Sequence, residues 1–212
     1  MDQDIRRLTQ PTVHDTMFFL TKPSTERIQR LIDSCRTAPF NYAEVGQSLG
    51  PTPAGYVYNH GRVRLGHGEA IFNRAVEALR NWKMFDLGWV SLCWPDAEIV
   101  VGTTVAALAR HFGFWSLHPA RIVFLVDDDD ARTRRKGFAY GTLQGHGERG
   151  EETFIIERLH SDDSVWYDLR SFSRPGQPLT ALGYPIARML QKRFARESPQ
   201  TMLKAVWEGR GD

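Results

Sequence analysis

The fold is decided by three consecutive runs of residues: RKGFAYGTLQ (135–144), EETFIIERL (151–159) and SVWYDLRSF (164–172). Each run is rich in β-branched or aromatic residues and is bounded by Gly, Asp or Ser, which favours a strand that ends in a turn. After Arg174-Pro175-Gly176 the apolar residues follow a helical period instead. These runs therefore predict an antiparallel meander followed by a long helix that lies across its open face.

The C-terminal helix is expected from about Pro178 to Ala195. Its buried stripe is predicted to consist of Leu182, Ile186, Met189, Leu190 and Phe194. Ser198-Pro199 resembles an N-cap followed by a first helical residue, so a separate short helix is expected to start there.

The preceding part of the chain alternates between strand and helix patterns. Residues 17–21 predict a short strand, and Ser24 is the expected N-cap of a helix over residues 24–38. A long Gly- and Pro-rich loop follows. Later patterns predict a helix at Glu69–Trp82 and strands at Tyr56–Leu65, Trp89–Cys93, Thr103–His111, Phe114–Ser116 and Arg121–Val126.

This order predicts an α+β fold in which a curved antiparallel sheet of six or seven strands wraps the long C-terminal helix. Residues 1–54 are expected to form an N-terminal extension, made of a loose arm over residues 1–16, a short strand, a helix and a long loop. Residues 55–209 are expected to form the main domain.

The composition is that of an ordinary globular protein, with 42% hydrophobic and 25% charged residues in a chain of 212. A net charge of +2 gives no support for nucleic-acid binding. The two cysteines, Cys35 and Cys93, form no CxxC pattern, which suits a reducing compartment. The longest uncharged apolar run, Ile99–Ala109, is too short to span a membrane. We therefore expect a soluble, cytoplasmic protein; the sequence does not decide between a monomer and a homodimer.

A glycine-rich turn, GHGERG (145–150), formally matches the GxGxxG pattern. That pattern binds a dinucleotide only where it opens a helix, whereas here a strand pattern follows and the neighbouring glutamates would repel phosphate. His146 and Glu148 also spell HxE, but the cysteine pair that completes a zinc-deaminase signature is missing. Neither GxxxxGK[ST] nor HExxH occurs in the sequence. The sequence therefore predicts no cofactor and no metal site.

An acidic run, Asp127–Asp130, is followed closely by Arg132, Arg134, Arg135 and Lys136. One interpretation is a nucleotide or metal site. The other is a hairpin tip at which opposite charges face each other across two strands. We favour the hairpin, because adjacent carboxylates on a strand point alternately to opposite sides and converge poorly on one ion.

The turn between the first two quoted runs concentrates titratable groups. His146, Glu148 and Glu152 are the candidate catalytic residues, because a histidine beside carboxylates keeps one tautomer, has a raised pKa and can transfer protons. The alternative is an exposed polar hairpin tip. Further along, Asp168 and Arg170 share a strand face with aromatic residues, which indicates either a structural ion pair or the polar floor of a pocket. No G-x-S-x-G run supports covalent catalysis.

Several motifs resemble one known family. They are RVRLG (62–66), LGWV (87–90), GFAYGT (137–142), GHGERGEE (145–152), SVWYD (164–168), FSRP (172–175) and QKRFA (191–195). Together with Tyr42, Val45 and Gly46, they resemble the domain-of-unknown-function family nineteen-ninety over about residues 18–206. That family has no established activity. The element order is similar to the START/Bet v 1 helix-grip (SRPBCC) superfamily, in which a curved sheet wraps a long C-terminal helix around a hydrophobic cavity.

The superfamily resemblance implies three hypotheses, since its members include lipid and hormone carriers, aromatase/cyclases and co-chaperone modules. The leading one is that a small, largely apolar or aromatic molecule binds between the sheet and the C-terminal helix. The candidate ligand-binding residues are Trp115, Tyr140, Trp166, Asp168, Arg170 and Tyr184. The alternative is an acid/base enzyme of the cyclase, dehydratase or isomerase type that uses His146, Glu148 and Glu152. A protein-interaction module with a filled cavity is the third.

Overall fold

One curved antiparallel sheet organises residues 17–176 and 184–208, the part of the chain that the computed structural model describes. Seven strands of this part lie in the order β2-β8-β7-β6-β5-β4-β3, and the short β1 pairs with β5. The strands are β1 (Phe18–Phe19), β2 (Val57–His67), β3 (Val90–Cys93), β4 (Thr104–His111), β5 (Phe114–Asp129), β6 (Thr133–Thr142), β7 (Glu148–Leu159) and β8 (Ser164–Pro175). The helices are α1 (Thr25–Cys35), α2 (Glu69–Arg80), the 3-10 turn η1 (Lys83–Phe85) and α4 (Tyr184–Glu208).

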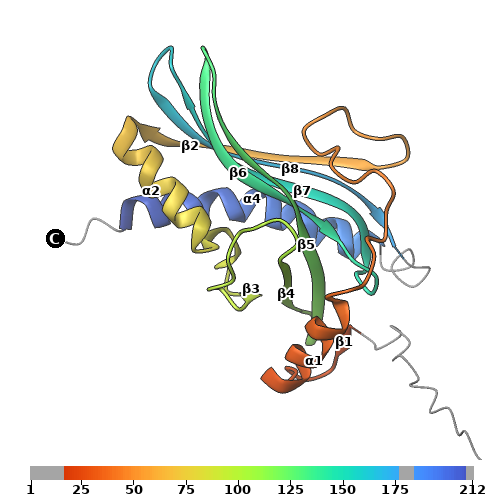
Figure 1. Ribbon diagram of the computed structural model, residues 1–212. Coiled ribbons are helices and arrows are strands. Elements are labelled where there is room, and N and C mark those ends of the chain that lie inside the picture. The colour runs from red at the N-terminus through yellow and green to blue at the C-terminus, as the bar shows by residue number, and fades with distance from the viewer. Residues whose placement is uncertain (1–16, 177–183, 209–212) are drawn as a thin grey trace, which may run out of the picture.

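The two faces of the sheet carry different helices. In Figure 1, α4 runs along the sheet with α2 beside it, while α1 lies with β1 at the far end. Val105 and Ala109 of β4 belong to the core that contains α2 and α4, whereas Ala106 and Leu108 pack in a second cluster with α1. Because successive residues of a strand point to opposite faces, α2 and α4 cover the inner face of the curved sheet and α1 covers the outer one.

Most of the predicted elements are confirmed. α1 is capped by Ser24, whose Oγ accepts the Arg27 amide, and β2 alternates between exposed and more buried residues as its pattern predicts. The strand expected at residues 17–21 is β1, which pairs with β5. The arm expected over residues 1–16 lies outside the described residues. The boundary expected between residues 54 and 55 stays a prediction.

The strands expected at Phe114–Ser116 and Arg121–Val126 are one continuous strand, β5, so the predicted break between them is wrong. Pro119 lies in this gap, and a proline cannot donate a hydrogen bond to a sheet ladder. Its carbonyl accepts the Leu143 amide at 3.2 Å, and the paired register with β6 begins at the next residue, Ala120. The missing amide therefore falls where the β5–β6 ladder ends, and the strand continues.

α4 is one helix with Pro199 inside it, so the separate final helix predicted at Ser198-Pro199 is wrong. Pro199 has no amide hydrogen for the carbonyl of Ala195, four residues earlier. That carbonyl lies against Gly61 of β2, where an added Cβ would be only 2.3 Å from the Ala195 oxygen. Pro199 is buried against β2, an edge strand of the sheet. This packing stabilises the helix at the position where one backbone hydrogen bond is lost.

The first half of α4 is less buried than predicted. Ile186 and Met189, two members of the predicted buried stripe, are 47% and 46% exposed. Leu182, a third member, lies outside the described residues. The buried residues of α4 instead include Met202 and Val206 in its second half. The helix is therefore packed on the core by its second half, and its first half lies over a hollow.

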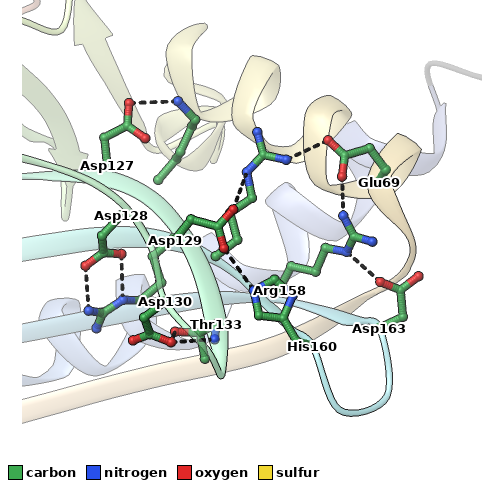
Figure 2. Close-up of polar contacts among 12 residues, drawn as sticks. Glu69, Asp127, Asp128, Asp129, Asp130, Thr133, Arg158, His160 and Asp163 are labelled. Carbon is green, nitrogen blue, oxygen red and sulfur yellow. Dashed lines mark hydrogen bonds and ion pairs between the residues drawn. The ribbon is translucent and has the colours of Figure 1, made fainter.

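The acidic run forms cross-strand ion pairs at the tip of the β5–β6 hairpin, as predicted (Figure 2). The pairs are Asp127–Lys136, Asp128–Arg135 and Asp129–Arg134. Glu69 of α2 accepts hydrogen bonds from Arg134 and from Arg158, so it ties the helix to the hairpin. Each of these three aspartates therefore has a cationic partner on the facing strand, which agrees with a structural role for the run.

Candidate functional site

A pocket of about 560 Å³ lies between the inner face of the sheet and the first half of α4. Much of its wall is apolar: Phe85 comes from η1, Trp89 from just before β3 and Leu169 from β8. Leu190 and Phe194 line it from α4. These two residues belong to the predicted buried stripe, and they are half-buried because they face this hollow rather than the sheet.

Three glutamates of β7 line the pocket, and two of them, Glu148 and Glu152, lie on the same side of the strand. Glu148 and Glu152 are four positions apart on the strand, so both side chains point to the inner face of the sheet. Gln191 of α4 donates from Nε2 to Glu148 Oε2 and, at 2.8 Å, to Ser173 Oγ. Tyr140 OH donates a 2.6 Å hydrogen bond to Glu152 Oε2, because these two residues are paired across β6 and β7.

Burial raises the pKa of each of these two carboxyls to about 7. For Glu148, burial outweighs the hydrogen bonds from Gln191 and Ser173, which lower the pKa. For Glu152, burial again dominates; the bond from Tyr140 lowers the pKa and the charge of Glu148 raises it. Carboxyls of this kind exchange a proton near neutral pH, which is typical of functional sites.

Two half-buried histidines lie next to each other in the pocket lining. The ring centroids of His118, on β5, and His146, in the β6–β7 turn, are 4.9 Å apart. Burial, with the neighbouring His111, lowers the pKa of His118 to about 4, and burial with the neighbouring His118 lowers the pKa of His146 well below its usual value. The predicted rise in the pKa of His146 is therefore wrong. Its Nδ1 accepts the backbone amide of Glu148 at 3.0 Å rather than pairing with a carboxylate.

Glu151 also belongs to the pocket lining, but it makes its hydrogen bonds with the loop on the outer side of the sheet. Its carboxylate accepts the Tyr42 hydroxyl and the Gly46 amide, both at 2.7 Å, and the Ser48 amide at 3.0 Å. These bonds fix the loop that precedes β2. The Tyr42-x-x-Val45-Gly46 run therefore has a structural use in holding this loop to β7.

The structure brings together four of the nine predicted site residues. His146, Glu148, Glu152 and Tyr140 line the pocket. Trp115 lies on β5 outside this lining, with Lys22 Nζ 5.6 Å and the Arg110 guanidinium 5.8 Å from its ring centroid. Tyr184 is the first residue of α4, and its side chain lies outside what the structure describes.

The remaining three, Trp166, Asp168 and Arg170, lie on the other face of β8, away from the pocket. Asp168 is buried and accepts hydrogen bonds from Arg62 at 2.6 Å and from Arg170 at 2.9 Å. His60 Nε2 is 3.2 Å from the same carboxylate, and the Arg62 guanidinium lies 5.0 Å from the Trp166 ring centroid. Asp168 and Arg170 thus form the structural ion pair that their pattern allowed, rather than the polar floor of the pocket.

Gln191 and His118 are among the pocket residues that the sequence did not predict. Gln191 lies four residues after Ala187 and three before Phe194, so a polar residue inside an apolar stripe was the available signal. His118 gave no such signal, because it lies in the part of β5 where the pattern predicts a break.

Among the residues that the structure describes, no group of three or more His, Cys, Asp or Glu side chains is placed to hold a metal ion. Within the same ranges, every helix is too short or too polar to cross a membrane.

Comparison with known proteins identifies the family. The model of a family described as a domain of unknown function, DUF1990, matches residues 41–201. The chain belongs to the DUF1990 family. It is 37% identical over 207 residues to a UPF0548 protein of Dictyostelium discoideum, covering 90% of this chain and 96% of the relative. It is 38% identical over 202 residues to a UPF0548 protein of Deinococcus radiodurans, covering 90% of this chain and 99% of the relative.

A crystal structure of TTHA0849 from Thermus thermophilus has a similar fold, with a TM-score of 0.50 and 14% sequence identity over 73% of this chain and 100% of that one. This likeness concerns the fold alone. The DUF1990 chain has the predicted helix-grip architecture, a curled antiparallel sheet with a long C-terminal helix. Its GFAYGT and GHGERGEE motifs supply Tyr140, His146, Glu148 and Glu152 to the pocket.

Proposed function

We propose that this DUF1990 domain binds a small, largely apolar molecule in the pocket under α4. The observation that carries the proposal is a hollow of about 560 Å³ whose wall is mainly apolar, with polar side chains from β7 and α4 among its lining residues. This is the usual make-up of small-molecule sites. The exposure of Ile186, an apolar residue that lines the same hollow, supports the proposal because a ligand would cover it.

The polar groups define what such a ligand carries. Below about pH 7 the carboxyls of Glu148 and Glu152, whose pKa values are about 7, are protonated, and each has one O–H to donate. Gln191 and Tyr140 already donate to these carboxyls. A ligand with an apolar body and one hydrogen-bonding oxygen therefore fits this end of the pocket.

An uncharged dye, N-phenyl-1-naphthylamine (NPN), tests the proposal because its fluorescence rises in apolar surroundings. The wild-type protein is expected to bind NPN saturably with one-to-one stoichiometry. Ala187 lines the pocket from α4. Ala187→Trp, which fills the hollow, is expected to weaken binding about tenfold or more, whereas the control Ala187→Ser stays within about twofold of wild type.

Two results would overturn the proposal. One is the absence of saturable NPN binding by the wild-type protein. The other is equal binding by wild type and by an Ala187→Trp variant whose thermal melt is unchanged, since the dye would then be bound elsewhere.

An acid/base enzyme is the second candidate, favoured by the two carboxyls with pKa values of about 7 that line one pocket. A carboxylate of this kind can accept a proton from a bound substrate. Ring opening of 5-nitrobenzisoxazole reports such a base, because one proton abstraction breaks the N–O bond and releases a phenolate. The rate is expected to rise through about pH 7 and to be lost in Glu152→Gln with NPN affinity retained. A rate no higher than that with free acetate would exclude this candidate.

A further inference from the structure

A second, basic groove adjoins the pocket. It is lined by the turn between β4 and β5 and by residues of α4. His111, Phe112 and Leu190 line both the groove and the pocket, so the two hollows meet at these residues. Nδ1 of His111 is buried there and has no hydrogen-bond partner among the described residues. Since buried polar atoms are almost always paired, a partner group is expected at this junction.

The groove is strongly cationic. Among the described residues, its lining contains no Asp or Glu and five basic side chains: Arg110, Arg188, Lys192, Arg193 and Arg196. Glu197 pairs with two of these cations, with Arg193 at 2.9 Å and with Arg196 at 3.4 Å. A third, Arg188, lies near enough to Glu148 of the pocket for its charge to lower the pKa of that carboxyl against the effect of burial.

Three of these cations lack a carboxylate partner within residues 17–176 and 184–208. Arg188 donates to the uncharged oxygens of Asn59, at 2.9 Å, and of Gln191. Arg110 and Lys192 form no ion pair with any described residue, and they lie on the two sides of the groove, one on β4 and one on α4. The groove is therefore suited to an anion held between them.

Apolar side chains are mixed with these charges. Phe112, at the tip of the β4–β5 turn, is 63% exposed, and Met189 is 46% exposed. A polyanion would satisfy the cations but would leave these side chains in water. A molecule with both an anionic group and an apolar body covers both kinds of surface.

We propose that the ligand of this domain is an anionic amphiphile, with its apolar body in the pocket and its carboxylate, sulfonate or phosphate group in the basic groove. The inference rests on the proposed function, and it adds the charge and the orientation of the ligand. The orientation follows from the glutamates. Ionised Glu148 and Glu152, which line the pocket, would repel an anion there, whereas Arg110 and Lys192 attract it in the groove.

Two dyes with the same aromatic body test this inference. 8-Anilinonaphthalene-1-sulfonate (ANS) carries a sulfonate that NPN lacks. At about 20 mM salt the wild-type protein is expected to bind ANS about tenfold more tightly than NPN, and this advantage should shrink at about 300 mM salt. In Arg110→Gln/Lys192→Gln the ANS affinity is expected to fall about fivefold, with NPN affinity unchanged.

The matched control is Arg80→Gln/Lys204→Gln, which removes the same charge from exposed positions outside the groove. It should leave both affinities unchanged. If NPN binds but ANS binds no more tightly than NPN, the inference is wrong and the proposed function stands. The same holds if the control double variant lowers the ANS affinity as much as Arg110→Gln/Lys192→Gln does. If neither dye binds saturably, both fail.

Discussion

Replacing Glu152 by glutamine removes one half-buried titrating group and should change how folding stability depends on pH. In the folded protein burial raises the pKa of this carboxyl to about 7, from a usual value of 4.5. The folded state therefore holds a proton that the unfolded state releases between these two values. The stability from this group is fully present below about pH 4.5 and is lost as the pH rises through about 7.

The expected size follows from the same two pKa values. Each pKa unit corresponds to about 1.4 kcal/mol, so the shift from 4.5 to about 7 corresponds to ~3 kcal/mol between acid and alkaline conditions. About 2–3 kcal/mol of this falls between pH 5 and 8. The amide in Glu152→Gln can still accept the hydrogen bond of Tyr140. Its N–H₂ group changes the free energy of unfolding by an amount that is the same at every pH.

Urea unfolding followed by circular dichroism, at several pH values from 5 to 8, measures this effect. The free energy of unfolding of wild type should fall with pH more steeply than that of Glu152→Gln, by about 2–3 kcal/mol over this range. Glu98→Gln, which changes an exposed carboxylate, should follow wild type. Parallel pH profiles for wild type and Glu152→Gln would show that this carboxyl is ionised normally in the fold, and the reasoning would fail.

Three further predictions concern packing, charge and binding. Gly61→Ala should lower the free energy of unfolding by about 1–3 kcal/mol, because the added Cβ would be 2.3 Å from the Ala195 oxygen of α4. The control is Gly50→Ala, whose Cβ would meet its nearest neighbour at 3.4 Å, and equal losses in the two variants would contradict a close approach of α4 to Gly61. Asp168→Asn should lower the free energy of unfolding by about 1–3 kcal/mol at pH 7, measured with urea, and by less in acid. Burial raises the pKa of this carboxyl, but the hydrogen bond and charge of Arg170 bring it below its usual value, so the carboxylate stabilises the fold only until it is protonated. The control Asp128→Asn, in an exposed ion pair, should change the stability very little. NPN affinity, measured by fluorescence, should weaken above about pH 7, since the two pocket glutamates then ionise beside an apolar dye; an affinity constant from pH 5 to 9 would count against it.

Local patterns in the sequence were enough to predict the sheet. The alternation in β2 and the charge sequence from Asp127 to Lys136 each reflect neighbours that the strand geometry fixes, and both predictions are confirmed. The continuous β5 and α4 could not be predicted in this way. In both cases a proline that breaks a local rule, Pro119 or Pro199, is accommodated by an element far away in the sequence.

The pocket residues were harder to predict, because a strand pattern shows which residues share a face but not which face is concave. On β8, Asp168 and Arg170 share one face and Leu169 lies on the other, and the curvature of the sheet places Leu169 in the pocket. The exposure of Ile186, which lines the pocket, and of Met189, which lines the basic groove, also depends on the position of α4 over the sheet. Their apolar spacing predicts a stripe, but the hollow under the stripe depends on how far α4 stands from the sheet.

The position of a bound ligand is the most direct test of the account. A crystal structure of the protein with a brominated NPN would locate the bromine by its anomalous signal. We expect it in the hollow between Leu169 of the sheet and the Leu190–Phe194 side of α4. A bromine elsewhere on the surface, with α4 closed onto the sheet at these residues, would contradict a binding pocket in this fold.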